Sequence, residues 1–303
     1  MAQVSMEGRV AIVTGAGRAL GRAYALLLAE RGAKVVVNDL GTDIDGRGCD
    51  TSLAETAVDE IRARGGTAVA DASDVSDPAG GTAVVDVAIR SFGRIDAVVA
   101  NAGIHATANF EDTSLDDFAH QWRIHFGGTV TVAQAAWPHL KAQGYGRVIT
   151  TGSGGGIFGF AGQASYAAAK GAIQALTRVL ALEGKDYGIL ANMIAPGAFS
   201  RMAAPSLTDP ATLERSRNLL PPELVAPIVL WLASDRCTAS GEAFTVWGGR
   251  IARLAVGAGR GLIDRSLTAE TIDERYAEIA SLEGLHEPVD VLAELDRWVP
   301  EIR

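Results

Sequence analysis

The chain has 303 residues, of which 48% are hydrophobic and 21% charged, and this composition fits a globular protein whose core needs neither disulfides nor metal ions. A formal net charge of −9 without a Lys/Arg stripe argues against a nucleic-acid partner. The two cysteines, Cys49 and Cys237, match no metal-ligand spacing, and no apolar run is long enough to span a membrane. We therefore expect a cytoplasmic protein with reduced thiols and no metal site.

Seven short apolar runs rich in β-branched residues alternate with helical patterns along the first 249 residues. They are 9–14, 34–39, 67–71, 95–101, 146–151, 189–195 and 242–247. This alternation predicts a parallel sheet with helices on both faces, and continuous hydrophobicity predicts strands buried on both sides. We expect one α/β domain over residues 1–249, with a doubly wound, Rossmann-type sheet of seven parallel strands.

The first predicted strand runs directly into the segment TGAGRALG and then into a helical pattern. Glycines at a strand-to-helix turn let the backbone approach a pyrophosphate, which free N–H groups and the helix dipole stabilise. The position of the motif therefore predicts a dinucleotide site. Its expected cofactor contacts are Gly15, Arg18, Ala19, Leu20 and Gly21.

The second predicted strand ends at Asp39, where a carboxylate would meet the adenosine ribose. It can accept hydrogen bonds from both ribose hydroxyls but repels a 2′-phosphate, and Leu40 rather than an arginine follows. These features favour NAD over NADP, the alternative being an aspartate that only closes the turn. The glycine- and aspartate-rich segment 41–50 is long enough to border a ligand.

A possible catalytic pattern consists of Ser153, Tyr166 and Lys170. On a helix, Tyr166 and Lys170 lie one turn apart on the same face. A lysine ammonium beside a phenol favours the phenolate, which lowers a pKa of roughly 10 and makes the tyrosine usable in proton transfer. The alternative is a half-exposed tyrosine and a surface lysine at the start of a helix.

These motifs, together with Asp74-Val75, the segment Ala100–Gly103 and Pro196-Gly197, resemble the short-chain dehydrogenase/reductase family from about residue 7 to 249. The resemblance implies that Tyr166 exchanges a proton with the substrate oxygen while hydride moves between the same carbon and the nicotinamide. Lys170 would also hold the nicotinamide ribose, and Ser153 would hydrogen-bond the oxygen. The further cofactor contacts that it implies are Asp74, Val75, Asn101, Ala102, Gly103, Pro196, Gly197, Phe199 and Ser200.

One position departs from the broad family. Most members carry an asparagine in the helix after the ANAG segment, where it anchors a water-mediated proton relay, and this chain has His125 in that slot. An imidazole titrates near neutral pH and can relay a proton. A purely structural histidine is the alternative.

Four further segments resemble the dehydrogenase part of the type 2 peroxisomal multifunctional enzymes. They are NDLGTDIDGRG, AAWPHLKAQGYGRVI, IAPGAFSRM and APIVLWLAS. This subgroup implies NAD-dependent oxidation of an (R)-3-hydroxyacyl-CoA, including steroid side-chain CoA esters. A free 17β-hydroxysteroid is the alternative substrate, and a catalytically silent NAD-binding module the alternative function. Because hydratase and sterol-carrier regions and an SKL-like ending are missing, we expect a stand-alone, bacterial-type cytoplasmic relative.

Four other segments bear on substrate and assembly. Residues 196–221 predict a lid beside the substrate or an ordinary surface helix, and the glycines at 154–156 predict a wide apolar pocket. Small residues on the Tyr166 helix suit either a buried core helix or the family's dimer interface, so we expect a homodimer, with a homotetramer as the alternative. Residues 250–303 predict a helical extension packed on the domain.

Overall fold

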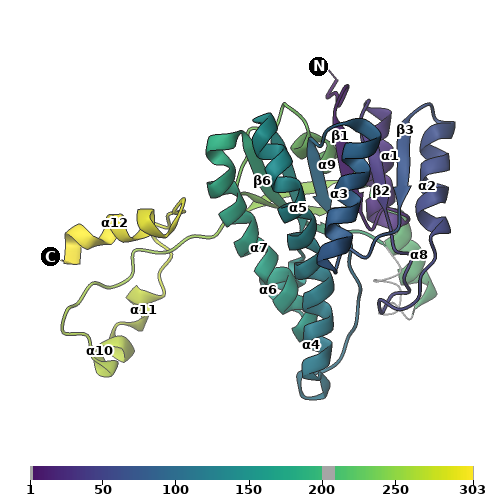
Figure 1. Cartoon of the computed structure of the whole chain (residues 1–303). Helices are drawn as coiled ribbons and strands as arrows, with labels where there is room; N and C mark the ends of the chain where they lie inside the picture. The colour runs from purple at the N-terminus through teal and green to yellow at the C-terminus, as the bar shows by residue number, and fades with distance from the viewer. Residues whose placement is uncertain (1–2, 200–208, 303) are drawn as a thin grey trace. The chain divides into compact units, whose positions relative to one another are not determined.

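Short runs of Val, Ile and Ala form a single sheet in the computed structural model, which describes residues 3–199 and 209–302 (Figure 1). The strands are β1 (Val10–Thr14), β2 (Lys34–Asn38), β3 (Thr67–Asp71), β4 (Ala97–Ala100), β5 (Gly146–Thr151), β6 (Ile189–Gly197), β7 (Ala243–Trp247) and β8 (Arg250–Leu254). Their order is β3-β2-β1-β4-β5-β6-β7-β8, and β1 to β7 pair in parallel. This confirms the predicted doubly wound, Rossmann-type sheet.

The edge strand β8 differs from the prediction of seven strands. It follows β7 after only two residues, Gly248 and Gly249, with φ angles of +49° and +86°. Two such residues between neighbouring strands make the tight turn of an antiparallel hairpin. The sequence pattern does not indicate β8, because a Gly-Gly pair fits the end of a sheet as well as a turn within it.

Helices cover both faces of the sheet (Figure 1). They are α1 (Ala19–Glu30), α2 (Ser52–Ala63), α3 (Pro78–Phe92), α4 (Leu115–Trp122), α5 (Gly128–Gln143), α6 (Gly154–Phe158), α7 (Ala164–Gly184), α8 (Pro210–Leu219) and α9 (Ala226–Ala233). Buried side chains of α1, α2 and α9 form the core on one face, and those of α3 and α5 form the core on the other, where α7 also packs. Burial of this apolar surface is the main stabilising contribution.

The chain divides into two compact units, Met1–Arg253 and Leu254–Arg303. The second unit contains α10 (Ala269–Glu274), α11 (Tyr276–Ile279) and α12 (Val291–Ile302), with a bridge between Ala258 and His286. The helical pattern around residue 275 thus forms two short helices, because Arg275 leaves helical geometry at φ −110° and ψ 18°. Packing of this unit on the first remains a prediction. In the described parts of the chain, no helix combines the length and hydrophobicity of a membrane span.

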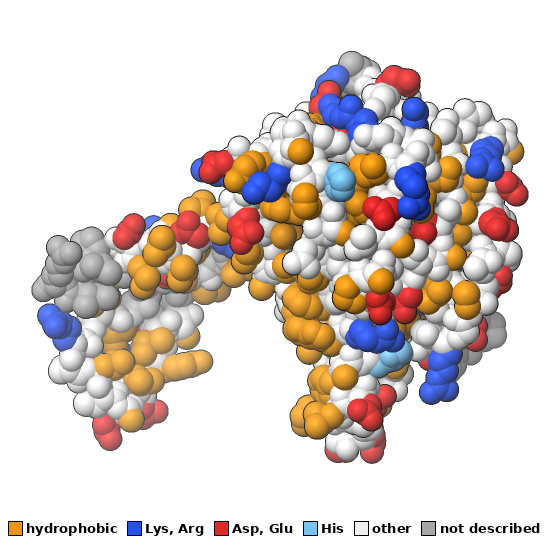
Figure 2. Space-filling model, in the orientation of Figure 1, with side chains coloured by type: hydrophobic (Ala, Val, Ile, Leu, Met, Phe, Trp, Pro, Cys, Tyr) orange, Lys and Arg blue, Asp and Glu red, His pale blue; other side chains and the backbone are white. Residues whose placement is uncertain are grey.

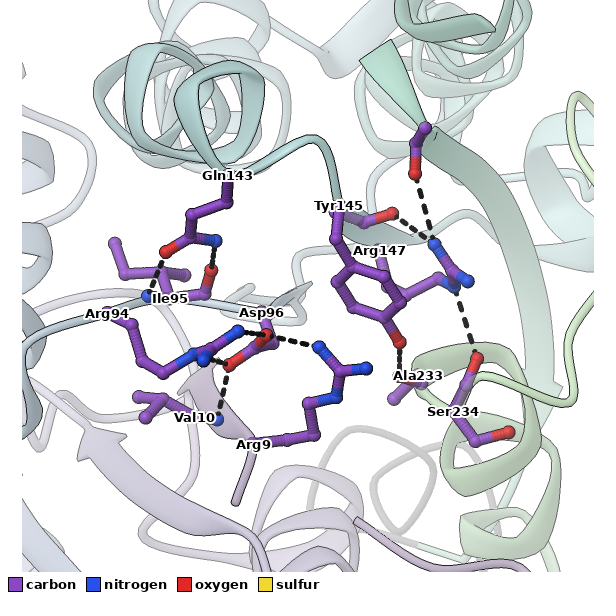
Figure 3. A network of polar contacts seen from close by, with 12 residues as sticks. Arg9, Val10, Arg94, Ile95, Asp96, Gln143, Tyr145, Arg147, Ala233 and Ser234 are labelled. Atoms are coloured by element: carbon purple, nitrogen blue, oxygen red, sulfur yellow. Dashed lines mark hydrogen bonds and ion pairs between the residues drawn. The ribbon is translucent and has the colours of Figure 1, made fainter. Parts of the chain in front are cut away.

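A charged network joins the amino ends of β1, β4 and β5 (Figure 3). Asp96 is fully buried just before β4, and its carboxylate accepts hydrogen bonds from Arg9, Arg94 and the backbone N–H of Val10 at 2.6–2.9 Å. Both oxygens therefore have donors, and two guanidinium groups offset the carboxylate charge.

The same network continues through an aromatic stack. The guanidinium carbons of Arg9 and Arg147 lie 3.9 and 4.1 Å from the centre of the Tyr145 ring (Figure 3). Arg147 also donates to the carbonyl oxygens of Gly146 at 2.8 Å and Ser234 at 3.1 Å. Charge at this edge of the sheet is therefore paired or hydrogen-bonded.

Candidate active site

The opposite edge of the sheet, at the carboxyl ends of the strands, holds a cavity of about 670 Å³. Strand order reverses between β1 and β4, so their following loops diverge and leave a crevice. The cavity lies against the loops after β1, β2, β4, β5 and β6. It is therefore placed where open α/β sheets bind their ligands.

The glycine-rich loop after β1 lies at the floor of this crevice. Gly15 has φ +62°, and a Cβ atom there would lie 2.8 Å from Ala102 Cα. A Cβ on Gly21 would lie 2.1 Å from the Gly15 carbonyl oxygen. Asn101 fixes the loop by donating to the Thr14 and Gly15 carbonyls at 3.0 and 3.2 Å. Only glycine fits at these two positions, and the result is a turn with bare backbone facing the cavity.

Asp39 closes the next turn and lines the cavity as well. Its two carboxylate oxygens accept hydrogen bonds from the backbone N–H groups of Gly17 and Gly41, each at 2.8 Å. Arg18 is directed to the carbonyl oxygen of Thr42 at 2.8 Å. The turn-closing role of Asp39 is thus real, and the same carboxylate lies on the cavity wall.

The predicted catalytic residues come together on one wall of the cavity. Ser153 is the N-cap of α6, where its Oγ accepts the Gly155 N–H at 3.1 Å, and it lines the cavity together with Tyr166 from the first turn of α7. Lys170, one turn further along α7, is buried and donates to the Thr151 carbonyl oxygen at 2.7 Å. Its Nζ lies 5.9 Å from the centre of the Tyr166 ring.

Burial dominates the acid–base properties of this wall. It raises the pKa of Tyr166 above its ordinary value, although the neighbouring Ser153 hydroxyl opposes the change. Burial also lowers the pKa of Lys170 to about 7. The expected lowering of the Tyr166 pKa by the ammonium is therefore wrong for the chain alone, because desolvation outweighs the charge of a lysine that favours its own neutral form.

His125 lies on a π-helical turn, Arg123–Gly127, between α4 and α5. It is 1% exposed, and its Nε2 donates to the Ile104 carbonyl oxygen at 2.9 Å. Burial and the neighbouring Lys170 lower its pKa well below the ordinary value, so the imidazole is neutral. Its ring meets the Tyr166 ring edge-on at 5.1 Å, and Nδ1 has no hydrogen-bond partner among residues 3–199 and 209–302. His125 thus makes the hydrogen bond expected of a structural histidine, and its buried Nδ1 is available as an acceptor for a further donor.

Most of the predicted site residues share this cavity. Those that line it are Gly15, Arg18, Ala19, Leu20, Gly21, Asp39, Asp74, Val75, Asn101, Ala102, Gly103, His125, Ser153, Tyr166, Lys170, Pro196 and Gly197. Among the described lining residues, Ala198 stands where Phe199 was predicted. The Phe199 N–H donates to the Leu220 carbonyl oxygen at 2.7 Å, and its ring lies under Arg217. Ser200 lies outside the described residues.

Several cavity residues were not predicted from the sequence. His105 follows β4 and meets the Tyr166 ring edge-on at 5.6 Å, and Trp247 ends β7 and packs over Gly197. Arg123 donates to Ser76 Oγ at 2.6 Å. Position alone could have indicated Trp247, because it ends a parallel strand at the carboxyl edge of the sheet.

The chain is similar in sequence to a known protein family and to known proteins. The family description "short chain dehydrogenase" matches residues 9–210. The peroxisomal multifunctional enzyme type 2 of Mus musculus is 43% identical over 93% of this chain, which spans only 38% of that protein. A short-chain type dehydrogenase/reductase of Mycobacterium tuberculosis is 41% identical over 92% of this chain and 96% of its own length.

A solved structure agrees with these relatives. It is a 7α-hydroxysteroid dehydrogenase complexed with NADH and 7-oxo glycochenodeoxycholic acid, with a TM-score of 0.72 and 30% identity over 81% of this chain and 95% of that one. Fold, cavity position and sequence similarity agree over most of the first unit. The chain belongs to the short-chain dehydrogenase family and is an oxidoreductase.

Proposed function

We propose that the chain is an NAD-dependent dehydrogenase that oxidises the secondary alcohol of a lipid-like substrate, an (R)-3-hydroxyacyl-CoA thioester. The observation that carries the proposal is that Ser153, Tyr166 and the buried Lys170 line one wall of the same cavity as Asp39. An alcohol oxygen placed between the two hydroxyls would meet one donor and one proton acceptor.

The residues present fit a nicotinamide dinucleotide. The loop around Gly15 and Gly21 offers bare backbone at the start of α1, which suits a pyrophosphate. The carboxylate of Asp39 would repel a 2′-phosphate, and Arg18, which could attract one, already donates to Thr42. These features support NAD over NADP. When bound, the nicotinamide supplies the acceptor of the hydride.

Each catalytic residue then has a defined task. Tyr166 passes its own proton to Lys170 and takes the proton of the alcohol as the C–H hydride leaves the same carbon, and Ser153 hydrogen-bonds the oxygen as it becomes a carbonyl. Lys170 has a pKa of about 7, so it can receive a proton from Tyr166 and release it toward solvent at neutral pH. The His125 ring meets the Tyr166 ring, and its Nδ1 has no hydrogen-bond partner among the described residues, which supports a relay through a bound water.

The mouth of the cavity supports an apolar substrate. Phe158 and Phe160 line the cavity and are 72% and 66% exposed, and Trp247 lines it too. Figure 2 shows hydrophobic side chains gathered over α6 and α4 on this face of the first unit. Exposed aromatic side chains beside a reactive site suit an acyl chain or a steroid. The similarity to a steroid-bound dehydrogenase favours a free hydroxysteroid as the second candidate.

The test compares substrates under one set of conditions. With NAD, we expect kcat/KM to be highest for an (R)-3-hydroxyacyl-CoA of medium chain length and at least tenfold lower for a free 17β-hydroxysteroid. For the same acyl-CoA substrate, we expect kcat/KM to be lower with NADP than with NAD. The (S)-enantiomer is the matched control. A higher kcat/KM for the steroid would show that the proposed acyl-CoA substrate is wrong. NADH binding without turnover of any alcohol would identify a catalytically silent binding module.

We also propose a homodimer formed through α7. Ala168 and Ala175 lie on an exposed face of this helix, so core packing does not account for these small residues. The same helix exposes Val179 and Leu182 at 47% and 46%. Small and apolar side chains on one exposed helix face suit close packing against a second copy. Light scattering of Ala168→Glu should show monomers where the parent chain forms dimers.

A further inference from the structure

The connection between β2 and α2 is unusually long for an α/β unit, and its central part, residues 41–50, forms a strap. The strap is closed at its base, where the Asp50 N–H donates to the carbonyl oxygen of Leu40, the residue just before the strap, at 3.2 Å. Its tip is held by its own hydrogen bond, from the Asp43 N–H to the Arg47 carbonyl oxygen at 2.7 Å. A compact loop with close ends can move as one piece about its base.

The strap lies along the cavity, which Thr42, Ile44 and Gly46 help to line. Three groups from different parts of the fold fasten it. Arg18 donates to the Thr42 carbonyl oxygen at 2.8 Å, and the His105 N–H donates to that of Ile44 at 2.9 Å. The imidazole of His120, on α4, donates from Nε2 to the Asp45 carbonyl oxygen at 3.0 Å. These contacts join the strap to the loops after β1 and β4 and to α4.

The tip of the strap has a fitted seat. Gly46 has φ +85°, and a Cβ atom there would lie 3.1 Å from both His120 Nε2 and Ile104 Cγ2 and 3.2 Å from Ile124 Cδ1. Gly48 has nearly the same backbone angle, φ +79°, yet a Cβ atom there would meet nothing within 4 Å. The two glycines thus separate backbone strain from contact with the seat.

We propose that the strap closes over the bound dinucleotide, that it must leave its seat for cofactor exchange, and that His120 is the positioning residue that holds it closed. This inference rests on the proposed use of NAD. It follows from a cavity wall made of a loop that Arg18, the His105 N–H and His120 join to neighbouring segments, and whose tip fits one side-chain seat. Loops at the surface, held without a buried apolar core of their own, open at low cost compared with the core.

The experiment measures NADH dissociation by stopped-flow fluorescence, with excess NAD added to prevent rebinding. We expect Gly46→Ala to release NADH about tenfold faster than the parent, because the added methyl group displaces the tip from its seat. Gly48→Ala carries the same backbone strain and should change the rate less than twofold. Equal acceleration by both variants would overturn the role of the seat.

A second pair of variants tests His120. Loss of its hydrogen bond in His120→Ala should accelerate release about threefold to tenfold, and His120→Gln, which keeps an N–H donor, should restore most of the parent rate. His139→Ala on α5 is the control, and melting temperatures report any general loss of structure. Release at the parent rate from His120→Ala would overturn the assignment. A parent chain that binds no NADH would instead contradict the proposed function, and the strap proposal with it.

Discussion

The two edges of the sheet treat buried charge in opposite ways. At the amino ends of the strands, Asp96 is fully buried and receives donors on both oxygens, including the guanidinium groups of Arg9 and Arg94 (Figure 3). At the carboxyl ends, Lys170 is also buried, but its one hydrogen-bond acceptor is a backbone carbonyl, and no described carboxylate pairs with it. Of these two buried groups, only Asp96 is paired with groups of opposite charge.

The difference shows where the chain is built for stability and where for chemistry. A buried charge with full partners keeps its ionised form and fixes neighbouring strands. A buried lysine without an opposite charge has its pKa moved toward neutrality, which costs stability but makes proton transfer possible at pH 7. Variants at the two edges should therefore have opposite effects on stability and activity.

The largest expected effect is on activity at the carboxyl edge. Tyr166→Phe removes the hydroxyl that exchanges the substrate proton, and we expect kcat to fall about 10³- to 10⁴-fold with the preferred alcohol and NAD. NADH affinity should change less than threefold, because the ring remains. Steady-state kinetics and NADH fluorescence measure the two quantities. Turnover within tenfold of the parent rate would contradict the role of Tyr166.

The next effect is a loss of stability at the amino edge. Asp96→Asn leaves the guanidinium groups of Arg9 and Arg94 without their buried counter-charge, so the free energy of unfolding should fall by about 3–5 kcal/mol. The control is Asp86→Asn on α3, whose ion pair with Arg90 is exposed and should be worth less than about 0.5 kcal/mol. Urea unfolding measures both. At a temperature where the variant is folded, kcat should match the parent, and equal stability losses at Asp86 and Asp96 would remove the contrast.

The parts of the fold and site that the sequence predicted are those set by local rules. Strand positions follow from apolar runs, and the turn at Gly15 and the one-turn spacing of Tyr166 and Lys170 follow from backbone geometry. Asp39 could be placed at the cavity because it directly follows a parallel strand. These features depend on neighbours in the sequence and on the one-directional order of a parallel sheet.

The remaining features depend on contacts between distant segments. Trp247 reaches the cavity from β7, and the seat of Gly46 combines residues of the β4 loop, α4 and the π-helical turn after it. The direction of the Tyr166 pKa depends on how completely the fold buries the phenol, which residue spacing does not show. The strand β8 was missed for a local reason, because a Gly-Gly pair fits both a hairpin turn and a domain end.

A smaller expected effect is a gain of stability from mutating a buried residue, where a loss is usual. Lys170→Met replaces a buried amine with an apolar side chain of similar length, so at pH 7 the cofactor-free chain should become more stable by about 2 kcal/mol. Activity should be lost at the same time. Thermal and urea unfolding measure stability, with the exposed Lys185→Met as control, expected within about 0.5 kcal/mol of the parent. A destabilised Lys170→Met chain would show that the lysine is held mainly for structure.

The pH dependence of stability gives the finest test of the contrast. The pKa of Lys170 is about 7 in the folded chain and near its ordinary value of 10.5 when unfolded, so between these values the unfolded chain binds one more proton. Raising the pH therefore favours the folded state, by at most about 1.4 kcal/mol per pH unit.

Comparing two chains across the window from pH 7 to 9 isolates this effect, because the raised pKa of the buried Cys237 thiol, which opposes it near pH 9, is common to both chains. The lowered pKa of His125 reduces stability only as the pH falls below about 6.5, and the raised pKa of Tyr166 reduces it only as the pH rises above about 10. Urea unfolding of the cofactor-free chain across this window should show stability rising with pH in the parent, relative to Lys170→Met. The gap between the two chains should be largest at pH 7 and narrow toward pH 9. Parallel curves would mean that Lys170 stays charged when buried, and the two edges of the sheet would then differ in geometry but not in their treatment of charge.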